Sequence, residues 1–365
     1  MPKIRFILSK QPDPALEEAA MIKRLKEFYT DLQDKRQISD GIPQEERAAY
    51  NELWHYPQNE LPKALEMRIR RWAQKIHRHH LQEVEPTRLS REDRAMLEGC
   101  RDGADIFDLR SAHHIDEIAA GLHVEFPWIS EATTHVWRSL HHNLKAGMPG
   151  ARFAPILLDG PPGIGKSAWA RRLAQLLGTP DMIVDATSEN ASFGLVGSQR
   201  GWSNAGPGRL VSLMLMRQVA NPLVIIDEIE KSGTPMSDKG RSFSLPNALL
   251  PLLDDLTASR WTCPYFQNQF DMSFINWVFT SNSQWGLPEP LLSRLRVVSV
   301  PSPTQEQIND LVLREAAKRQ LSPLITAAIT TALAGAFEVG HQINIRTVKR
   351  MLDSGLDQQD RPILH

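Results

Sequence analysis

The stretch "GPPGIGKSAWARRLAQLLG", which runs from Gly160 to Gly178 directly after the apolar run "PILLD", decides the fold. It fits the P-loop pattern GxxxxGK[ST], in which a glycine-rich bend joins a strand to a helix. Glycines let successive backbone N–H groups turn toward an anion, and the N-terminus of the helix adds positive partial charge. The sequence therefore predicts a nucleotide-binding loop made of Gly160, Pro161, Pro162, Gly163, Ile164, Gly165, Lys166 and Ser167.

The last two residues of this loop predict the cofactors. A lysine in the place of Lys166 reaches the β- and γ-phosphates of a nucleoside triphosphate, and a hydroxyl in the place of Ser167 is a ligand for Mg²⁺. The alternative is a tight strand–helix turn that contains Gly and Lys by chance, at odds of roughly one in a hundred for average residue frequencies. We therefore expect ATP and Mg²⁺ to bind here.

A second apolar run, "NPLVIIDEIEK", ends in two carboxylates, Asp227 and Glu228. Ligands of open parallel sheets bind at the carboxyl ends of the strands, where these two side chains are expected. Asp227 is predicted to hold the Mg²⁺ shell and Glu228 to act as the general base toward water. Acidic residues often end strands at solvent, but a pair in register with a P-loop predicts an ATPase.

The order of elements along the chain predicts an α/β fold with a parallel sheet flanked by helices. The β-rich runs "PILLD", "DMIVDAT", "PLVIIDE", "INWVFTSN" and "VVSVP" alternate with helical segments that begin near Lys166, Pro207, Pro246 and Pro288. Helical patterns alone precede and follow them. We expect a mostly helical N-terminal domain over 1–110, the α/β ATPase core over 111–302 and a helical lid over 303–365.

Composition limits the class of protein. The 365 residues include 41% hydrophobic and 23% charged residues, with a formal net charge of −1, which argues against a wholly basic nucleic-acid binder. The two cysteines, Cys100 and Cys263, are too far apart for a CxxC motif and predict neither disulfides nor a thiolate metal site. No apolar stretch approaches the roughly 18 residues of a membrane span, so we expect a cytoplasmic protein without membrane contact.

With these motifs, the chain resembles the AAA+ ATPase superfamily over about Phe126 to Leu352, and within it the ATPase module of Lon-type proteases. The segments "GSQRGWSNAGPGRL" and "VFTSNSQWGLPEPLLSRLRVV" carry the resemblance to Lon. It implies that Asn282 is the sensor-1 residue, which orients water near the γ-phosphate. It also implies that Arg294 is the arginine finger, with Arg296 as the second candidate, and that Arg346 is the sensor-2 arginine.

The same resemblance implies an assembly and a client. An arginine finger acts on the nucleotide of the neighbouring subunit, so a homo-oligomeric ring is implied, and a hexamer is usual in the superfamily. Trp202 falls where Lon has the aromatic residue that grips a protein client in the central pore. A second candidate pore loop, "SGTPMSDKGRSFSLP", carries Lys239, Arg241 and Phe243.

Proteolysis is not expected from this chain. Its sequence ends at His365, which leaves no room after the lid for the Ser–Lys peptidase domain of Lon. A separate peptidase acting with the ring is left open as a partner.

The N-terminal segment "MRIRRWAQKIHRHH" has two interpretations. Ile69, Trp72 and Ile76 have the spacing of a core stripe, which favours an ordinary helix with a solvated charged face. Its cations and Trp72 would also suit a nucleic-acid backbone, an alternative that is not favoured. The "HRHH" cluster is expected to lie on the surface of a helix and not to bind metal.

The leading hypothesis is a ring-forming AAA+ ATPase that couples ATP hydrolysis to remodelling or threading of a protein partner. The first alternative is a DNA-associated motor or loader of a mobile element or replication system. The second is an ATP-binding scaffold with little turnover, against which the presence of Glu228, Asn282 and Arg294 argues.

Overall fold

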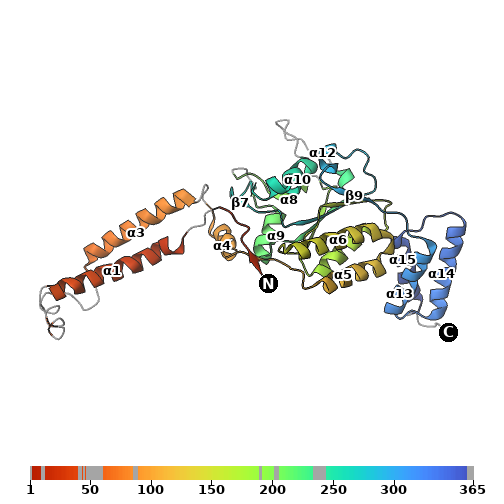
Figure 1. The fold of residues 1–365 in the computed structure, drawn as a ribbon, viewed down its shortest axis with the longest axis horizontal. Coiled ribbons are helices and arrows are strands. Elements are labelled where there is room, and N and C mark those ends of the chain that lie inside the picture. The colour runs from red at the N-terminus through yellow and green to blue at the C-terminus, as the bar shows by residue number, and fades with distance from the viewer. Residues whose placement is uncertain are drawn as a thin grey trace. The chain divides into compact units, whose positions relative to one another are not determined.

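The computed structural model describes residues 2–9, 13–39, 43, 46, 61–84, 89–188, 191–200, 205–232 and 244–359. The chain forms two compact units, one made of Ser9–Glu98 and the other of Met1–Leu8 with Gly99–His365. The larger unit contains the central sheet and, toward the C-terminus, a cluster of three helices (Figure 1). Within the described residues, no helix has both the length and the apolar character that crossing a bilayer requires.

The central sheet has five strands, all parallel, in the order β4-β5-β8-β3-β9. Each of the five predicted β-rich runs supplies one of them, so the predicted α/β fold class is confirmed. The strands are β3 (Ile156–Asp159), β4 (Asp181–Asp185), β5 (Leu223–Asp227), β8 (Asn276–Ser281) and β9 (Arg296–Ser299).

Both faces of this sheet are buried, as in parallel sheets with helices on both sides. Side chains of a strand alternate between the faces. On β5, Leu223 and Ile225 join the main apolar cluster on one face, whereas Val224 and Ile226 point to the other, and all four are fully buried. The continuous apolar run "LVII" is therefore the expected sequence of an internal strand.

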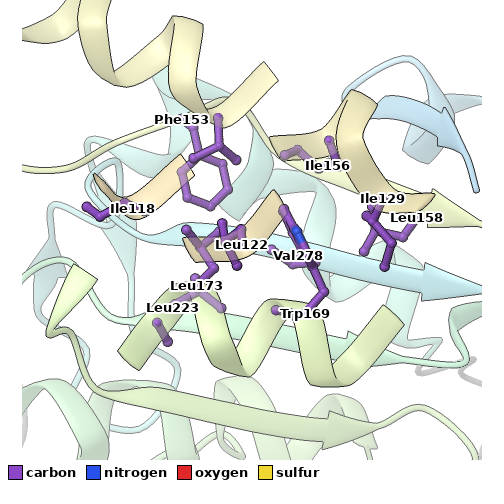
Figure 2. Close-up of a cluster of buried hydrophobic side chains, with 14 of the residues drawn as sticks. Ile118, Leu122, Ile129, Phe153, Ile156, Leu158, Trp169, Leu173, Leu223 and Val278 are labelled. Atoms are coloured by element: carbon purple, nitrogen blue, oxygen red, sulfur yellow. The ribbon is translucent and has the colours of Figure 1, made fainter. Parts of the chain in front are cut away.

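The main apolar cluster joins the sheet to three helices, α5 (Ala112–Glu125), α6 (Ser130–Ala146) and α7 (Lys166–Leu177). Figure 2 shows Trp169 and Leu173 of α7 among side chains from the sheet and from the neighbouring helices. Trp169 is fully buried and its indole N–H donates to the Thr133 hydroxyl at 3.0 Å. This packing fixes the axis of α7, and with it the position of the glycine-rich loop that precedes it.

The remaining elements of the larger unit are short. The helices are η2 (Pro127–Ile129), α8 (Ala191–Val196), α9 (Arg209–Arg217), η3 (Ile229–Lys231), α10 (Leu245–Leu253), α11 (Asp255–Ala258) and α12 (Glu289–Leu292). Two antiparallel pairs join β1 (Lys3–Ile4) to β2 (Ala104–Asp105) and β6 (Trp261–Thr262) to β7 (Gln269–Phe270). The pairing of β1 with β2 attaches the start of the chain to the larger unit, and the domain limits expected from sequence stay a prediction.

Three helices form the C-terminal bundle: α13 (Gln305–Lys318), α14 (Pro323–Glu338) and α15 (Ile345–Gln359). They enclose a small apolar cluster of their own that includes Val312, Leu333 and Val348. Helix α13 begins with a capping box, in which the Thr304 hydroxyl accepts from the Gln307 N–H and the Gln307 side chain accepts from the Thr304 N–H.

The smaller unit is built on two long helices, α1 (Glu18–Ser39) and α3 (Lys63–Val84), that pack against each other. The short η1 (Pro14–Leu16) precedes α1. Helix α4 (Arg91–Gly99) follows α3, and its cap Ser90 accepts from the Asp93 N–H at 3.0 Å.

One interpretation of the smaller unit from sequence is wrong. Ile69 is fully buried, but Trp72 is 45% and Ile76 41% exposed, so the three do not form one core stripe. Among the side chains of α3 that the structure describes, Ile69 and Ala73 alone are buried. The 3.6-residue period shows which side chains share one face of a helix. It does not show how much of that face the neighbouring helix covers.

Candidate nucleotide-binding site

The carboxyl ends of β3, β5 and β8 meet at one edge of the sheet, next to a cavity of about 520 Å³. This cavity lies between the glycine-rich loop and the C-terminal bundle. It is lined by Val124, Glu125, Phe126, Trp128, Pro162, Gly163, Gly165, Lys166, Ser167, Ala168, Asp227, Glu228, Thr280, Asn282, Leu311, Arg314, Glu315, Lys318, Ile345, Arg346 and Lys349. Residues from distant parts of the sequence thus form one concave polar and apolar site.

The loop between β3 and α7 is held from both sides. Gly163 and Gly165 have φ of +77° and +92°, a backbone conformation that favours glycine. The Ile164 carbonyl accepts from the Trp128 indole at 2.8 Å, and the Gly163 carbonyl accepts from the Ile345 N–H at 2.9 Å. A Cβ at Gly165 would lie 3.1 Å from Cδ1 of Ile345, so the start of α15 rests directly on the loop.

Lys166 stands at the start of α7 with its ammonium group inside the site. Nζ donates to the Gly160 and Pro161 carbonyls at 2.6 and 2.8 Å and to Oδ1 of Asn282 at 3.2 Å. Burial lowers the pKa of Lys166, against the opposing effect of nearby carboxylates, of which Glu230 is the strongest. The backbone carbonyls hold the cation within the loop, where phosphate oxygens would be stronger partners.

Asp227 at the end of β5 connects the loop to the sheet. Its Oδ1 accepts from the Ser167 hydroxyl at 2.7 Å and from the Thr280 hydroxyl at 2.5 Å. The two hydroxyls orient the carboxylate toward the loop. The structure therefore brings together the two residues expected to hold Mg²⁺, and it adds Thr280 from β8, which the sequence reasoning missed.

The residues present fit a magnesium ion. A hydroxyl and a carboxylate are hard oxygen donors, and Mg²⁺ is commonly held by one or two carboxylates together with substrate phosphates. Among the residues that the structure describes, no cluster of three or more His, Cys, Asp or Glu forms a complete metal cage. Ser167 and Asp227 would hold the ion, which when bound would neutralise charge that develops on the phosphates.

Glu228 follows Asp227 in a left-handed conformation, with φ of +54°, that is uncommon for residues other than glycine. Its N–H donates to the Thr280 hydroxyl at 3.1 Å, which fixes this turn. Its Oε2 lies 2.8 Å from Nζ of Lys231, and this partner raises the pKa of Lys231. The carboxylate lines the cavity but is paired with a cation.

Asn282 and Glu230 form a second link across the sheet edge. The Asn282 N–H donates to Oε1 of Glu230 at 3.0 Å, while its side-chain oxygen accepts from Lys166. The other carboxylate oxygen of Glu230 is buried without a hydrogen-bond partner in the described structure. Sequence reasoning missed Glu230 and Lys231, although both lie in "DEIEK", the segment that contains Asp227 and Glu228.

Part of the lining of the cavity is apolar. Val124, Phe126, Leu311 and Ile345 line it from α5, from the segment after α5, from α13 and from α15. An apolar slot beside a phosphate loop suits a flat heteroaromatic base. No motif marks these residues, because they come from four separate segments and differ in burial, from the buried Ile345 to the exposed Val124.

Arg346 lines the same cavity from α15 and is exposed. Arg294 does not line it. Instead Arg294 borders a different cavity of about 840 Å³, where Nη1 donates to the Pro290 carbonyl at 2.8 Å and Nη2 lies 3.7 Å from Asp254. Arg296 lies elsewhere, 3.7 Å from Glu131. The structure therefore places both candidate arginine fingers outside the cavity of their own chain.

The candidate pore residues cannot be placed. Trp202 and the second loop with Lys239, Arg241 and Phe243 lie outside the described residues.

The part of the chain that contains the central sheet and its loops matches a known protein family. Residues 156–301 match the family described as "ATPase family associated with various cellular activities (AAA)". The chain is 31% identical over 157 residues to the Lon protease of Malacoplasma penetrans, a match that covers 43% of this chain and 20% of that protein. It is 27% identical over 207 residues to the Lon protease of Desulforamulus reducens, covering 55% of this chain and 25% of that protein.

A solved structure shares the fold. The closed-state cryo-EM structure of Hsp104 with ATPγS and FITC-casein aligns with a TM-score of 0.52 and 18% identity, over 72% of this chain and 50% of that one. At this identity the likeness concerns the fold alone. The chain spans a quarter or less of the length of the two Lon proteases named above, so their whole activity does not carry over with the match.

Proposed function

Residues 156–301 form an ATPase domain of the AAA family, similar to that of Lon, and from this premise we propose how the chain works. It binds ATP with Mg²⁺ in the cavity between the glycine-rich loop and the C-terminal bundle, and hydrolyses it in a ring of identical subunits. The energy of hydrolysis remodels or threads a protein client. The proposed location is the cytoplasm.

The single observation that supports hydrolysis best is the convergence of Lys166, Ser167, Asp227, Glu228 and Asn282 on one cavity. Lys166 binds the β- and γ-phosphates in exchange for its carbonyl partners. Glu228 accepts the proton of the attacking water, and Asn282 orients that water. Hydrogen bonds already orient the Asp227 carboxylate and the Asn282 amide. Lys166 and the Glu228 carboxylate exchange their present partners when the nucleotide binds.

Arg346 and the apolar slot complete the site in one chain. In this proposal the arginine contacts the γ-phosphate from α15, so the C-terminal bundle senses whether the nucleotide is intact. The hydrogen bond between the Ile345 N–H and the Gly163 carbonyl ties that bundle to the loop. Hydrolysis can then change the position of the bundle relative to the sheet.

The placement of Arg294 supports a ring. The transition state of phosphoryl transfer is stabilised by an arginine finger, worth about 10³ to 10⁵ in rate. Arg294 lies outside its own nucleotide cavity, bordering another cavity with Asp254. In the proposed assembly, which by analogy with the superfamily is a hexamer, Arg294 reaches the nucleotide of the adjacent subunit.

The protein client is proposed from the resemblance to Lon. Relatives that match this module are proteases, whose substrates are polypeptides. Trp202 is proposed to grip the chain in the pore by apolar contact, which does not depend on the client's sequence. Peptide cleavage is not proposed for this chain; a separate peptidase docked on the ring is the proposed route where cleavage occurs.

The proposal is tested with the full chain at increasing protein concentration. Phosphate release should depend on Mg²⁺, rise more steeply than linearly with protein concentration, and increase further with an unfolded protein such as reduced casein. Absence of phosphate release at concentrations that give an assembled particle would leave only the scaffold alternative. Turnover without any stimulation by unfolded protein would refute the protein-client part alone.

A further inference from the structure

The outward side of α3 carries four cations in successive turns: Arg68, Arg71, Lys75 and Arg78, here called the α3 ridge. Their spacing of three, seven and ten residues places them on one side of the helix. All four are exposed, and Ile69 and Ala73 on the opposite side are fully buried. The ridge therefore points away from α1.

The ridge has no anionic partner among the described residues. The ion pairs that the structure shows in this unit, Lys26 with Glu66 and Lys35 with Asp31, use other side chains. Helix α3 has six Lys and Arg against two Glu, a net charge of +4, in a chain whose net charge is −1. The positive charge is thus concentrated on this helix, and the described part of the unit places no anionic partner at the ridge.

Trp72 lies beside the ridge and is 45% exposed. The guanidinium carbon of Arg68 lies 5.4 Å from the centroid of its ring, which is within cation–π range. The indole is therefore partly packed and partly open to solvent. Next to a line of cations, it offers a flat face on which a base can stack.

We propose that the α3 ridge binds the phosphodiester backbone of a nucleic acid, with Trp72 stacking on a base where the strand is single. From Arg68 to Arg78 the helix rises by about 15 Å, because each residue contributes about 1.5 Å. That length matches about four phosphates of one strand at about 3.4 Å each along a duplex axis. The surface is independent of the proposed ATPase site and could recruit the motor to nucleic-acid-bound clients.

The observations favour a polyanionic chain over a membrane surface. A helix inserted in a membrane surface needs a broad exposed apolar face. On α3 the side that carries Ile69 and Ala73 is buried. At about 100° per residue, the exposed Trp72 and Ile76 lie only about 40° apart around the helix, and the exposed Met67 lies about 180° from Ile76, so the exposed apolar strip is narrow.

The test measures binding of the full chain to labelled single-stranded DNA, the matching duplex and the matching RNA by fluorescence anisotropy. Four phosphate contacts predict a slope of log K against log salt of about −2.8 for single strands and about −3.6 for duplex. The double variant Arg71→Gln/Lys75→Gln should reduce that slope by about half. Trp72→Ala should weaken single-strand binding roughly tenfold and duplex binding much less.

A matched control removes the same charge from the other helix. Lys23→Gln/Lys35→Gln, on exposed positions of α1, should leave affinity and salt slope nearly unchanged. The proposal is overturned if no probe binds at 50 mM salt, or if the α3 double variant binds like wild type. It is also overturned if anionic lipid vesicles or an acidic peptide bind at the ridge while nucleic acid does not. Circular dichroism of each variant establishes that α3 is intact.

Discussion

The nucleotide cavity and the α3 ridge use positive charge in opposite ways. In the cavity, Lys166 is buried, bonded to two carbonyls and an amide oxygen, and surrounded by carboxylates. On the ridge, Arg71 and Lys75 are exposed and have no ion-pair partner among the described residues. The first arrangement is organised in advance for one small anion, and the second is open to an extended one.

The two kinds of site differ in how selectively they can bind a ligand. A preorganised site acts on the charge that develops at one atom, because its dipoles are fixed before the ligand arrives. An exposed row of cations binds by release of counterions and is sensitive to salt but indifferent to sequence. In the two proposals, the chain combines a specific chemical site with a general attachment surface, each in its own compact unit.

Loss of the proposed general base is expected to have a large effect that separates the two regions by their functions. Glu228→Gln should lower kcat by about 10² to 10⁴, because the general base is lost while the loop that binds phosphate is unchanged. ATP affinity and nucleic-acid binding by the α3 ridge should both be retained. Steady-state phosphate release, with nucleotide titration and anisotropy on the same protein, checks all three. Unchanged kcat would remove Glu228 from its proposed role.

A second prediction tests the packing of the smaller unit. Ile69→Ala should destabilise the α1–α3 pair by about 2–5 kcal/mol, because Ile69 is fully buried. Ile76→Ala, at a residue 41% exposed, should cost less than about 1 kcal/mol. Hydrogen exchange of α3 amides gives both values. Equal effects of the two substitutions would contradict the burial that separates Ile69 from the exposed side.

The smallest effect concerns the ion pair at the general base. Lys231→Met removes the cation 2.8 Å from Glu228. Pairs at this degree of exposure contribute about 0.2–1 kcal/mol, so turnover should rise by no more than about fivefold as the carboxylate is released. Lys231→Arg keeps the charge and should behave like wild type. A fall in kcat for Lys231→Met would mean that the lysine assists the reaction.

Most of the residues that the sequence singled out for the candidate site line one cavity, because strand ends in a parallel sheet meet at one edge. Lys166, Asp227 and Asn282 lie in or next to runs of recognisable β character, so topology alone brings them together. The apolar slot of Phe126 and Leu311 could not be predicted, because it depends on how the C-terminal bundle packs on the loop. The roles assigned to these residues are still proposals.

The smaller unit shows where pattern reasoning fails for another reason. Ile69 and Trp72 have equally good helical spacing, yet only Ile69 is covered by α1. Helical spacing gives the direction in which a side chain points from the helix. Its burial depends on how much of that side the neighbouring helix covers. The charged side of α3 was expected from sequence, whereas the exposure of Trp72 and Ile76 became visible only in the structure.

The central claim is that two copies of this chain complete one active site. Arg294→Ala and Glu228→Gln should each be nearly inactive alone, Arg294→Ala by about 10³-fold or more. Mixed in equal amounts under conditions of subunit exchange, they should regain turnover. The reason is that a Glu228→Gln subunit supplies an intact Arg294 to the intact cavity of its neighbour. Recovery of a substantial part of wild-type turnover is the predicted result, and a mixture as inactive as either variant would contradict the claim.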